Sequence, residues 1–167
     1  MMARTDPSRD ADENLALDLP PIQVTTWDHR CLSGVVEAFR LRGCGAQVEL
    51  LARELDRAEL VEPASVARDV VTMRSHVTIV DHGTGEGQAL TLVYPGEESR
   101  RQRKLAVVTP VGGALLGLRV GATMSWRTVE GETKRLTVFE VEAQPEMHGF
   151  YGVSAPRWTR PALRPRA

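Results

Sequence analysis

The chain is poor in the features by which many functional classes are recognised. Its 167 residues contain two cysteines, three tryptophans, three phenylalanines and two tyrosines, and the formal net charge is −1. Two cysteines cannot build a disulfide scaffold, and Cys31 and Cys44 lack the paired spacing of a zinc site. No stretch approaches the ~20 apolar residues that a membrane-spanning helix needs. Because the N-terminus also lacks a signal-peptide core, we expect a cytoplasmic protein with reduced thiols.

Common catalytic and cofactor-binding patterns are missing as well. The four histidines form no ligand pair at helical spacing, and no serine has a nucleophile-elbow context. The glycine-rich stretch 83–87 lacks the Lys-Ser/Thr ending of a phosphate-binding loop, and no helix pattern follows it, so it is predicted to be a hairpin turn. Asp81, His82 and Glu86 lie close together and could suggest acid–base catalysis, but polar residues are common in turns and need no catalytic role. We therefore expect no enzyme, no catalytic residue, no cofactor and no metal.

The first half of the chain predicts a short pair of helices. Charged residues make up 26% of the chain and hydrophobic residues 42%, which allows a core and a polar surface. A first amphipathic helix, capped by Thr26 or Asp28, is predicted to end near Leu41, and a second to span 46–60. The Gly-containing break between them favours an antiparallel hairpin within residues 22–61.

The second half predicts a sheet. Apolar residues alternate with polar ones from residue 70 onward, which is typical of half-buried strands. A short helix interrupts the strands, because Thr109 can cap it, Pro110 suits its first position and Gly117 can end it. The predicted strands span 70–79, 88–94, 105–108, 123–128 and 134–143. The fold class is therefore α+β, with a mostly antiparallel sheet around one short helix.

These elements divide the chain into five segments. Residues 1–21 form an acidic tail and 154–167 a basic, proline-rich tail, and both are predicted to lack ordered structure. Residues 22–61 form the helix hairpin, 62–69 a linker, and 70–153 the C-terminal sheet domain.

The stretch from Leu105 to Trp126, a strand, a short helix and a strand, resembles the C-terminal domain of the bacterial Gre transcript-cleavage factors. That resemblance implies an FKBP-like sheet with one helix packed on it. Four further stretches, taken in order along the chain, make this resemblance more specific. With them the chain resembles, across about residues 21–151, the Gre-related family called regulator of nucleoside diphosphate kinase. These stretches are 54–59, 69–77, 91–95 and 141–146. Arg74 departs from the pattern, which usually has Asn there.

The resemblance implies a binding partner, the rim of the secondary channel of RNA polymerase. In Gre factors a Ser-Pro turn that opens the short helix takes part in this contact, and the corresponding residues here are Thr109, Pro110 and Val111. The alternative is that these three residues only cap and pack the helix. A basic loop outside the family pattern could meet an acidic patch on a partner, or could simply be solvated. This basic loop contains Arg100, Arg101, Arg103 and Lys104.

The tip of the helix hairpin argues against transcript cleavage. Gre cleavage factors carry an acidic pair at the tip of a long coiled coil, where it helps to hold a Mg²⁺ that activates water. Here the tip, residues 41–46, contains no carboxylate, and Arg42 has the wrong sign to hold a cation. Helices of about 15 residues are also only roughly 22 Å long.

Three functions stay open on the sequence. The first is a non-enzymatic polymerase-binding regulator that affects nucleoside diphosphate kinase levels indirectly. The second is an FKBP-like prolyl isomerase or chaperone, although so few aromatic residues make a lined active-site cavity improbable. The third is a stand-alone protein-binding module. We expect a monomer without membrane contact. DNA binding is implied only weakly, through the family, and no direct sequence-specific nucleic-acid binding is expected from a net charge of −1.

Overall fold

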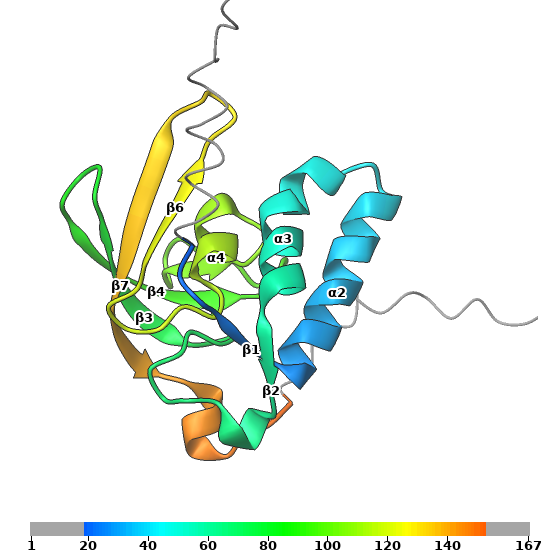
Figure 1. Ribbon diagram of the computed structural model, residues 1–167, viewed down its shortest axis with the longest axis vertical. Helices are drawn as coiled ribbons and strands as arrows, with labels where there is room; N and C mark the ends of the chain where they lie inside the picture. The colour runs from blue at the N-terminus through cyan, green and yellow to red at the C-terminus, as the bar shows by residue number, and fades with distance from the viewer. Residues whose placement is uncertain (1–18, 153–167) are drawn as a thin grey trace, which may run out of the picture.

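The computed structural model describes residues 19–152, so all but residues 19–21 of the two terminal segments that were expected to lack order lie outside it. Figure 1 shows a curled sheet on one side and a pair of helices, α2 and α3, on the other, with the short helix α4 between them. This is a mixed α+β fold, as the sequence predicts. Within the described residues no helix is both long and apolar enough to cross a membrane.

The sheet has five strands in the order β5-β4-β3-β7-β6. All neighbours are antiparallel except β4 and β5, which are parallel. The stretch 83–87 is the predicted turn between β3 and β4, where the amide of Gly85 donates to the carbonyl of Asp81 at 2.7 Å. The strands are β3 (His76–Asp81), β4 (Gly87–Val93), β5 (Lys104–Ala106), β6 (Thr123–Arg127) and β7 (Thr133–Ala143).

The helical layer differs from the prediction in its second half. Helix α2 (Thr26–Leu41) has the predicted end, but a 3₁₀ turn, η1 (Gly45–Val48), precedes a shorter α3 (Glu49–Arg57). The expected continuation to residue 60 is wrong, because Ala58 is extended and the next residues form β2 (Glu59–Val61), which pairs in parallel with β1 (Gln23–Thr25). Strands of three residues are too short to show a periodicity, so the sequence did not predict this pair.

The start of α2 corrects the expected cap. Thr25, rather than Thr26 or Asp28, is the N-cap, and its hydroxyl oxygen accepts from the amide of Asp28 at 3.0 Å. This satisfies one of the amides that a helix start leaves unpaired. Asp28 is instead the third helical residue, where its side chain is buried.

The strand predicted from Val70 begins only at His76. The chain first passes through a 3₁₀ turn, η2 (Pro63–Ser65), and then turns at Thr72, whose carbonyl accepts from the amide of Ser75 at 3.1 Å. Arg74 has a φ of 64°, in the left-handed region that Asn tolerates better than most residues. The Asn that the resemblance leads us to expect here would suit this conformation better than Arg.

The predicted helix α4 (Pro110–Leu115) forms with its predicted cap and stop. Thr109 is the N-cap, Pro110 is the first helical residue, and Gly117 follows the helix with a φ of 78°. A Cβ atom at Gly117 would lie 2.8 Å from the carbonyl oxygen of Gln23, so glycine is required there for space as well as for conformation. This close approach places the start of β1 directly against the end of α4.

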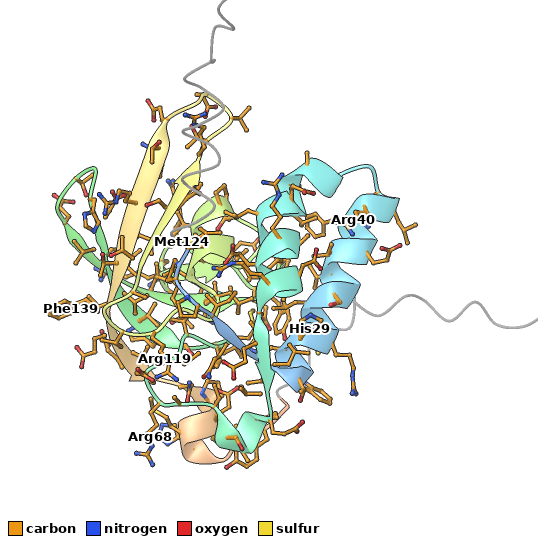
Figure 2. All side chains as sticks on the ribbon, in the orientation of Figure 1. His29, Arg40, Arg68, Arg119, Met124 and Phe139 are labelled. Carbon is orange, nitrogen blue, oxygen red and sulfur yellow. The ribbon has the colours of Figure 1, made fainter. Side chains whose placement is uncertain are left out.

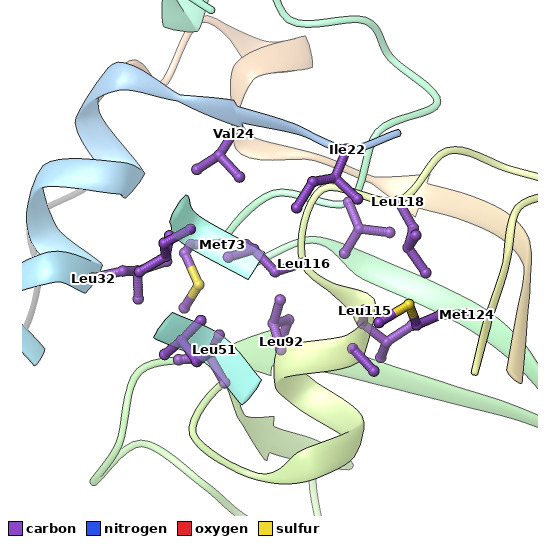
Figure 3. Close-up of a cluster of buried hydrophobic side chains, with 14 of the residues drawn as sticks. Ile22, Val24, Leu32, Leu51, Met73, Leu92, Leu115, Leu116, Leu118 and Met124 are labelled. Atoms are coloured by element: carbon purple, nitrogen blue, oxygen red, sulfur yellow. The ribbon is translucent and has the colours of Figure 1, made fainter. Parts of the chain in front are cut away.

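A continuous hydrophobic core joins the helices to the sheet. Figure 3 shows Leu32 of α2 and Leu51 of α3 meeting Leu92 of β4 and residues around α4. Both leucines of the hairpin are buried, at 0% and 1% exposure. The described chain closes with a 3₁₀ turn, η3 (Pro145–His148), after β7. The two helices therefore lie along the body of the protein and do not project from it.

Replacing Gly112 with alanine is expected to destabilise the protein by about 1–3 kcal/mol, because its Cβ would lie 2.3 Å from the carbonyl oxygen of Ala106. Gly34→Ala is the matched control. Its Cβ would meet nothing within 4 Å in the middle of α2, so that variant should gain up to about 1 kcal/mol. Chemical denaturation measures both, and equal stabilities for the two variants would contradict the packing of α4 described above.

Candidate partner-binding surface

The Thr-Pro-Val turn is built at the start of α4. The hydroxyl of Thr109 donates to the carbonyl of Ala106 at 2.8 Å and accepts from the amide of Gly112 at 3.1 Å. Its hydroxyl therefore helps to shape the turn. Pro110 is exposed and Val111 is half-buried, so the apolar surface that the turn presents comes mainly from these two residues.

Pro110 lies at one wall of a groove between α3 and β6. The groove has a volume of about 820 Å³ and is also lined by residues 128–130, in the turn between β6 and β7. Met124 and Trp126 of β6 face Leu50 of α3 across it. The indole N–H of Trp126 is buried and has no acceptor among the described residues. We call this the α3–β6 groove.

The basic loop is a compact turn before β5. Ser99 and Lys104 exchange two backbone hydrogen bonds of 3.1 and 2.8 Å, which close the loop. Arg103 has a φ of 53°, and this conformation lets the chain reverse over few residues. Arg100, Arg101 and Arg103 are exposed and Lys104 is half-buried. The loop therefore presents its guanidinium groups to solvent.

The basic loop and Pro110 line two different grooves that share no residue. The second groove, of about 610 Å³, lies between the basic loop and the turn after β3, and it includes Asp81 and Glu86 as well as Arg100 and Arg103. The structure therefore does not gather the seven predicted contact residues into one pocket. They form two neighbouring patches joined by β5.

The hairpin tip is short and carries no carboxylate. Arg42 and Cys44 are exposed there, and Gly43 has a φ of 75° that allows the tight turn. Both cysteines are free. No cluster of three or more potential metal-ligating side chains occurs in residues 19–152.

A buried polar cluster joins α2 to the chain before β3 and to η3, and sequence reasoning missed it. The carboxylate of Asp28 accepts from the amide of Met73 at 3.3 Å, and the hydroxyl of Thr72 donates to Glu146 at 2.7 Å. Ser75 bonds to both the amide and the hydroxyl of Thr72, at 2.9 and 3.0 Å. Three segments distant in sequence are thus tied together by side-chain hydrogen bonds.

Both carboxyl groups of this cluster are shifted toward the neutral form. Burial, reinforced by the neighbouring Glu146, raises the pKa of Asp28 to about 6. Burial also raises the pKa of Glu146, against the opposing effect of its hydrogen bond from Thr72. The only sequence signal was the acid at the third position of α2, which by itself indicates a favourable helix dipole interaction.

Arg74 lies beside this cluster and makes two contacts of its own. Its guanidinium forms an ion pair with Glu97 at 2.8 Å and stands 5.3 Å from the ring centroid of Tyr94. Tyr94 is fully buried, which raises the pKa of its hydroxyl. These contacts hold a residue in an uncommon backbone conformation, so Arg74 has a structural role here.

Comparisons with known proteins agree with this architecture. A family model for the "Transcription elongation factor, GreA/GreB, C-term" matches residues 66–143. The chain is also 44% identical over 103 residues to the regulator of nucleoside diphosphate kinase of Escherichia coli (strain K12), a match that covers 62% of this chain and 76% of that protein. The chain belongs to this Gre-related family.

More distant members show the same relationship. The transcription elongation factor GreA of Thermodesulfovibrio yellowstonii is 31% identical over 75 residues, which is 45% of this chain and 48% of that protein. The solved structure of a prokaryotic transcription elongation factor GreA/GreB from Nitrosomonas europaea covers 71% of this chain and 97% of its own, at 33% identity and a TM-score of 0.56. The predicted family and the GreA/GreB-like mixed fold are confirmed. These relatives are named as regulators or elongation factors, and none is named for a catalysed reaction.

The raised pKa of Asp28 predicts a specific pH dependence of stability. The Asp28 carboxyl has a pKa near 3.8 in the unfolded chain, so the folded protein binds the Asp28 proton more tightly than the unfolded chain does. The stability that this tighter proton binding adds is present below about pH 4, and it is lost as the pH rises through about 6. Asp28→Asn removes this loss. The variant's stability relative to wild type should rise by up to about 3 kcal/mol between pH 4 and pH 7.

Denaturation curves across this pH range measure the difference. Asp56→Asn, which removes an exposed carboxylate of α3, corrects for the change in net charge. Glu146, Arg74 and Tyr94 also face Asp28 and remain in both proteins. A constant difference between the wild type and Asp28→Asn would mean that Asp28 is not the titrating group.

Proposed function

We propose that this protein is a non-enzymatic transcription regulator that binds RNA polymerase at the rim of its secondary channel. Family membership supports a Gre-related role, and the position of Pro110 supports the contact. Pro110 is an exposed apolar residue at the first position of α4, a helix whose backbone lies in close contact with the chain after β5 and with α3. A rigid apolar projection beside a groove is what a small docking contact needs.

The basic loop supplies the second part of the proposed interface. Its three exposed arginines stand at the other end of β5 from the Thr-Pro-Val turn. Exposed guanidinium groups steer association with an acidic surface but add little affinity individually. In this proposal the apolar turn sets the strength of binding and the loop sets its rate.

In the same proposal, the protein does not stimulate transcript cleavage. The tip between α2 and α3 has no carboxylate to hold a Mg²⁺, and α2 spans 16 residues, about 24 Å at ~1.5 Å per residue. Because both helices pack on the body of the protein, their reach beyond it is small. The protein would thus act by occupying the channel entrance, as a monomer in the cytoplasm. Any link to nucleoside diphosphate kinase would be indirect.

The alternatives find less support in the described residues. A prolyl isomerase on an FKBP-like sheet needs a cavity lined by aromatic side chains. The two grooves described above contain one aromatic residue between them, Trp126. A stand-alone binding module without polymerase contact would use the same surface, and direct binding measurements distinguish it.

The purified protein is expected to bind core RNA polymerase with a dissociation constant in the micromolar range or tighter. Pro110→Glu should weaken this complex at least about 10-fold, because it places a charge in a small apolar contact. The variant should stay folded, since an acidic residue at the first position of a helix is favourable. Phe139→Glu is the control: Phe139 is 64% exposed on β7, and Figure 2 shows it pointing away from the helices. Normal binding by a folded Pro110→Glu protein would place the interface elsewhere.

The protein and a Gre cleavage factor should compete for one site on the polymerase. Adding this protein to stalled complexes should release no short 3′ RNA fragments, because the tip cannot hold a metal ion. It should also slow Gre-stimulated cleavage in proportion to its concentration, and excess Gre factor should restore cleavage. Unchanged cleavage at saturating concentrations, or a ternary complex with both factors bound, would contradict a shared site.

A further inference from the structure

The groove beside the basic loop carries charges of opposite sign on its two walls. Arg100, Arg103 and Lys104 line it from the basic loop, whereas Asp81 and Glu86 line it from the β3–β4 hairpin. Its volume of about 610 Å³ is within the range of ~300–1,000 Å³ that ligand sites usually have. We call it the charged groove.

The acidic wall is built into the hairpin that joins β3 to β4. Asp81 is the half-buried last residue of β3, and its carboxylate accepts from the amide of Gly83 at 2.7 Å. Glu86 is exposed, and its carbonyl accepts from the amide of Asp81 at 3.2 Å. In Figure 1 this hairpin is the green loop that projects from the sheet away from the helices. The hairpin therefore holds two carboxylates at one end of the groove.

Strand β4 sets the distance between the two walls. The basic loop is attached to it at Thr91, whose amide donates to the carbonyl of Arg103 at 2.8 Å and which pairs with Lys104. The acidic wall meets β4 at its first residue, Gly87, which is four residues before Thr91. Four residues of a strand span about 13 Å at ~3.3 Å per residue. The two charged ends are therefore separated by about the length of a five-residue extended peptide.

The floor of the groove suits a peptide backbone. It consists of Gln88 and Leu90 on β4 and Leu105 on β5. Leu90 is buried, Leu105 is half-buried and Gln88 is exposed. The amide group of Gln88 can both donate to and accept from a peptide group, and the leucines add apolar contact. The middle of the groove therefore offers neutral contacts between two charged ends.

The opposite charges of the walls discriminate between classes of partner. A nucleic-acid strand carries a negative charge at every nucleotide, so a strand that crosses the groove brings phosphates next to Asp81 and Glu86. Such a juxtaposition of like charges is unfavourable and suppresses binding of the wrong partner. A protein segment with one acidic and one basic side chain complements both walls at once.

We propose that the charged groove binds an extended protein segment that carries an acidic and a basic side chain four residues apart. The acidic side chain pairs with the basic loop, and the basic one pairs with Asp81 and Glu86. In an extended chain, residues four apart lie on the same face, so both side chains can point into the groove. This segment belongs to RNA polymerase, an assignment that rests on the proposed function, whereas the mixed-charge specificity of the groove does not.

Peptide binding to the full chain tests the specificity, with amide chemical shifts as the readout. The probes are the blocked peptides Glu-Val-Thr-Val-Lys and Lys-Val-Thr-Val-Glu, the same peptide with Glu or with Lys at both ends, and oligouridylate as a polyanion. One mixed-charge peptide is expected to bind at least ~5-fold more tightly than either like-charged peptide, because only it pairs with both walls. The amides of residues 81–88 and 99–105 should shift on binding.

Neutralising the acidic wall should reverse this preference. Asp81→Asn/Glu86→Gln keeps a side-chain oxygen for the amide of Gly83 and should bind oligouridylate at least ~5-fold more tightly than the wild type does. It should also lose the preference for the mixed-charge peptide over the acidic one. The matched control, Glu37→Gln/Asp56→Asn, removes the same charge at exposed positions of α2 and α3 and should behave as the wild type. Thermal melting checks that both variants are folded.

Each outcome decides the proposal. It is overturned if no mixed-charge peptide binds more tightly than the like-charged ones, or if the control variant changes as much as Asp81→Asn/Glu86→Gln. Tighter binding of oligouridylate than of any peptide by the wild type would also overturn it, in favour of a nucleic-acid partner.

Competition with core polymerase is measured separately. Displacement of polymerase by the mixed-charge peptide supports polymerase as the source of the segment. If the peptide binds and leaves the polymerase complex intact, that assignment is wrong while the specificity of the groove stands. If the wild type does not bind polymerase, the proposed function fails, and the peptide data still decide the groove.

Discussion

Close backbone contact around α4 is the constraint on which the rest of the structure depends. Gly112 lies against the carbonyl of Ala106, Gly113 lies against the backbone of Leu51, and Gly117 lies against Gln23. A side chain at the first or last of these positions would overlap backbone atoms of the neighbouring segment. The three glycines therefore let the sheet, α3 and the start of β1 approach one short helix at the same time. Dispersion and hydrophobic burial around α4 then follow from this geometry.

This packing also determines which surfaces the protein can present. Because α3 is held against α4, the helical pair becomes part of the body, and its tip carries an arginine and a cysteine where a cleavage factor would need acids. The first residue of α4 is left exposed at the rim of the α3–β6 groove.

The cluster of Asp28, Thr72, Ser75 and Glu146 has a different role at the opposite end of α2. The carboxyl group of Asp28 is buried and that of Glu146 is half-buried, and hydrogen bonds from one amide and one hydroxyl replace part of the lost hydration. The compensation is incomplete, which is why burial raises both pKa values. The cluster thus ties α2 to the sheet layer at a cost in stability near neutral pH.

Local signals in the sequence determined the Gre-related family, the fold class, the strand series and the start and end of α4. Thr109, Pro110 and Gly117 act within a few residues of themselves, so a capping hydroxyl, a fixed φ and a left-handed stop can be recognised without a structure. Tertiary structure alone decided the three-residue β1–β2 pair, the left-handed conformation of Arg74 and the burial of Asp28. It also decided that the basic loop and Pro110 line separate grooves. Each of these depends on residues far apart in the chain, and a one-dimensional pattern carries no information about which distant segments come into contact.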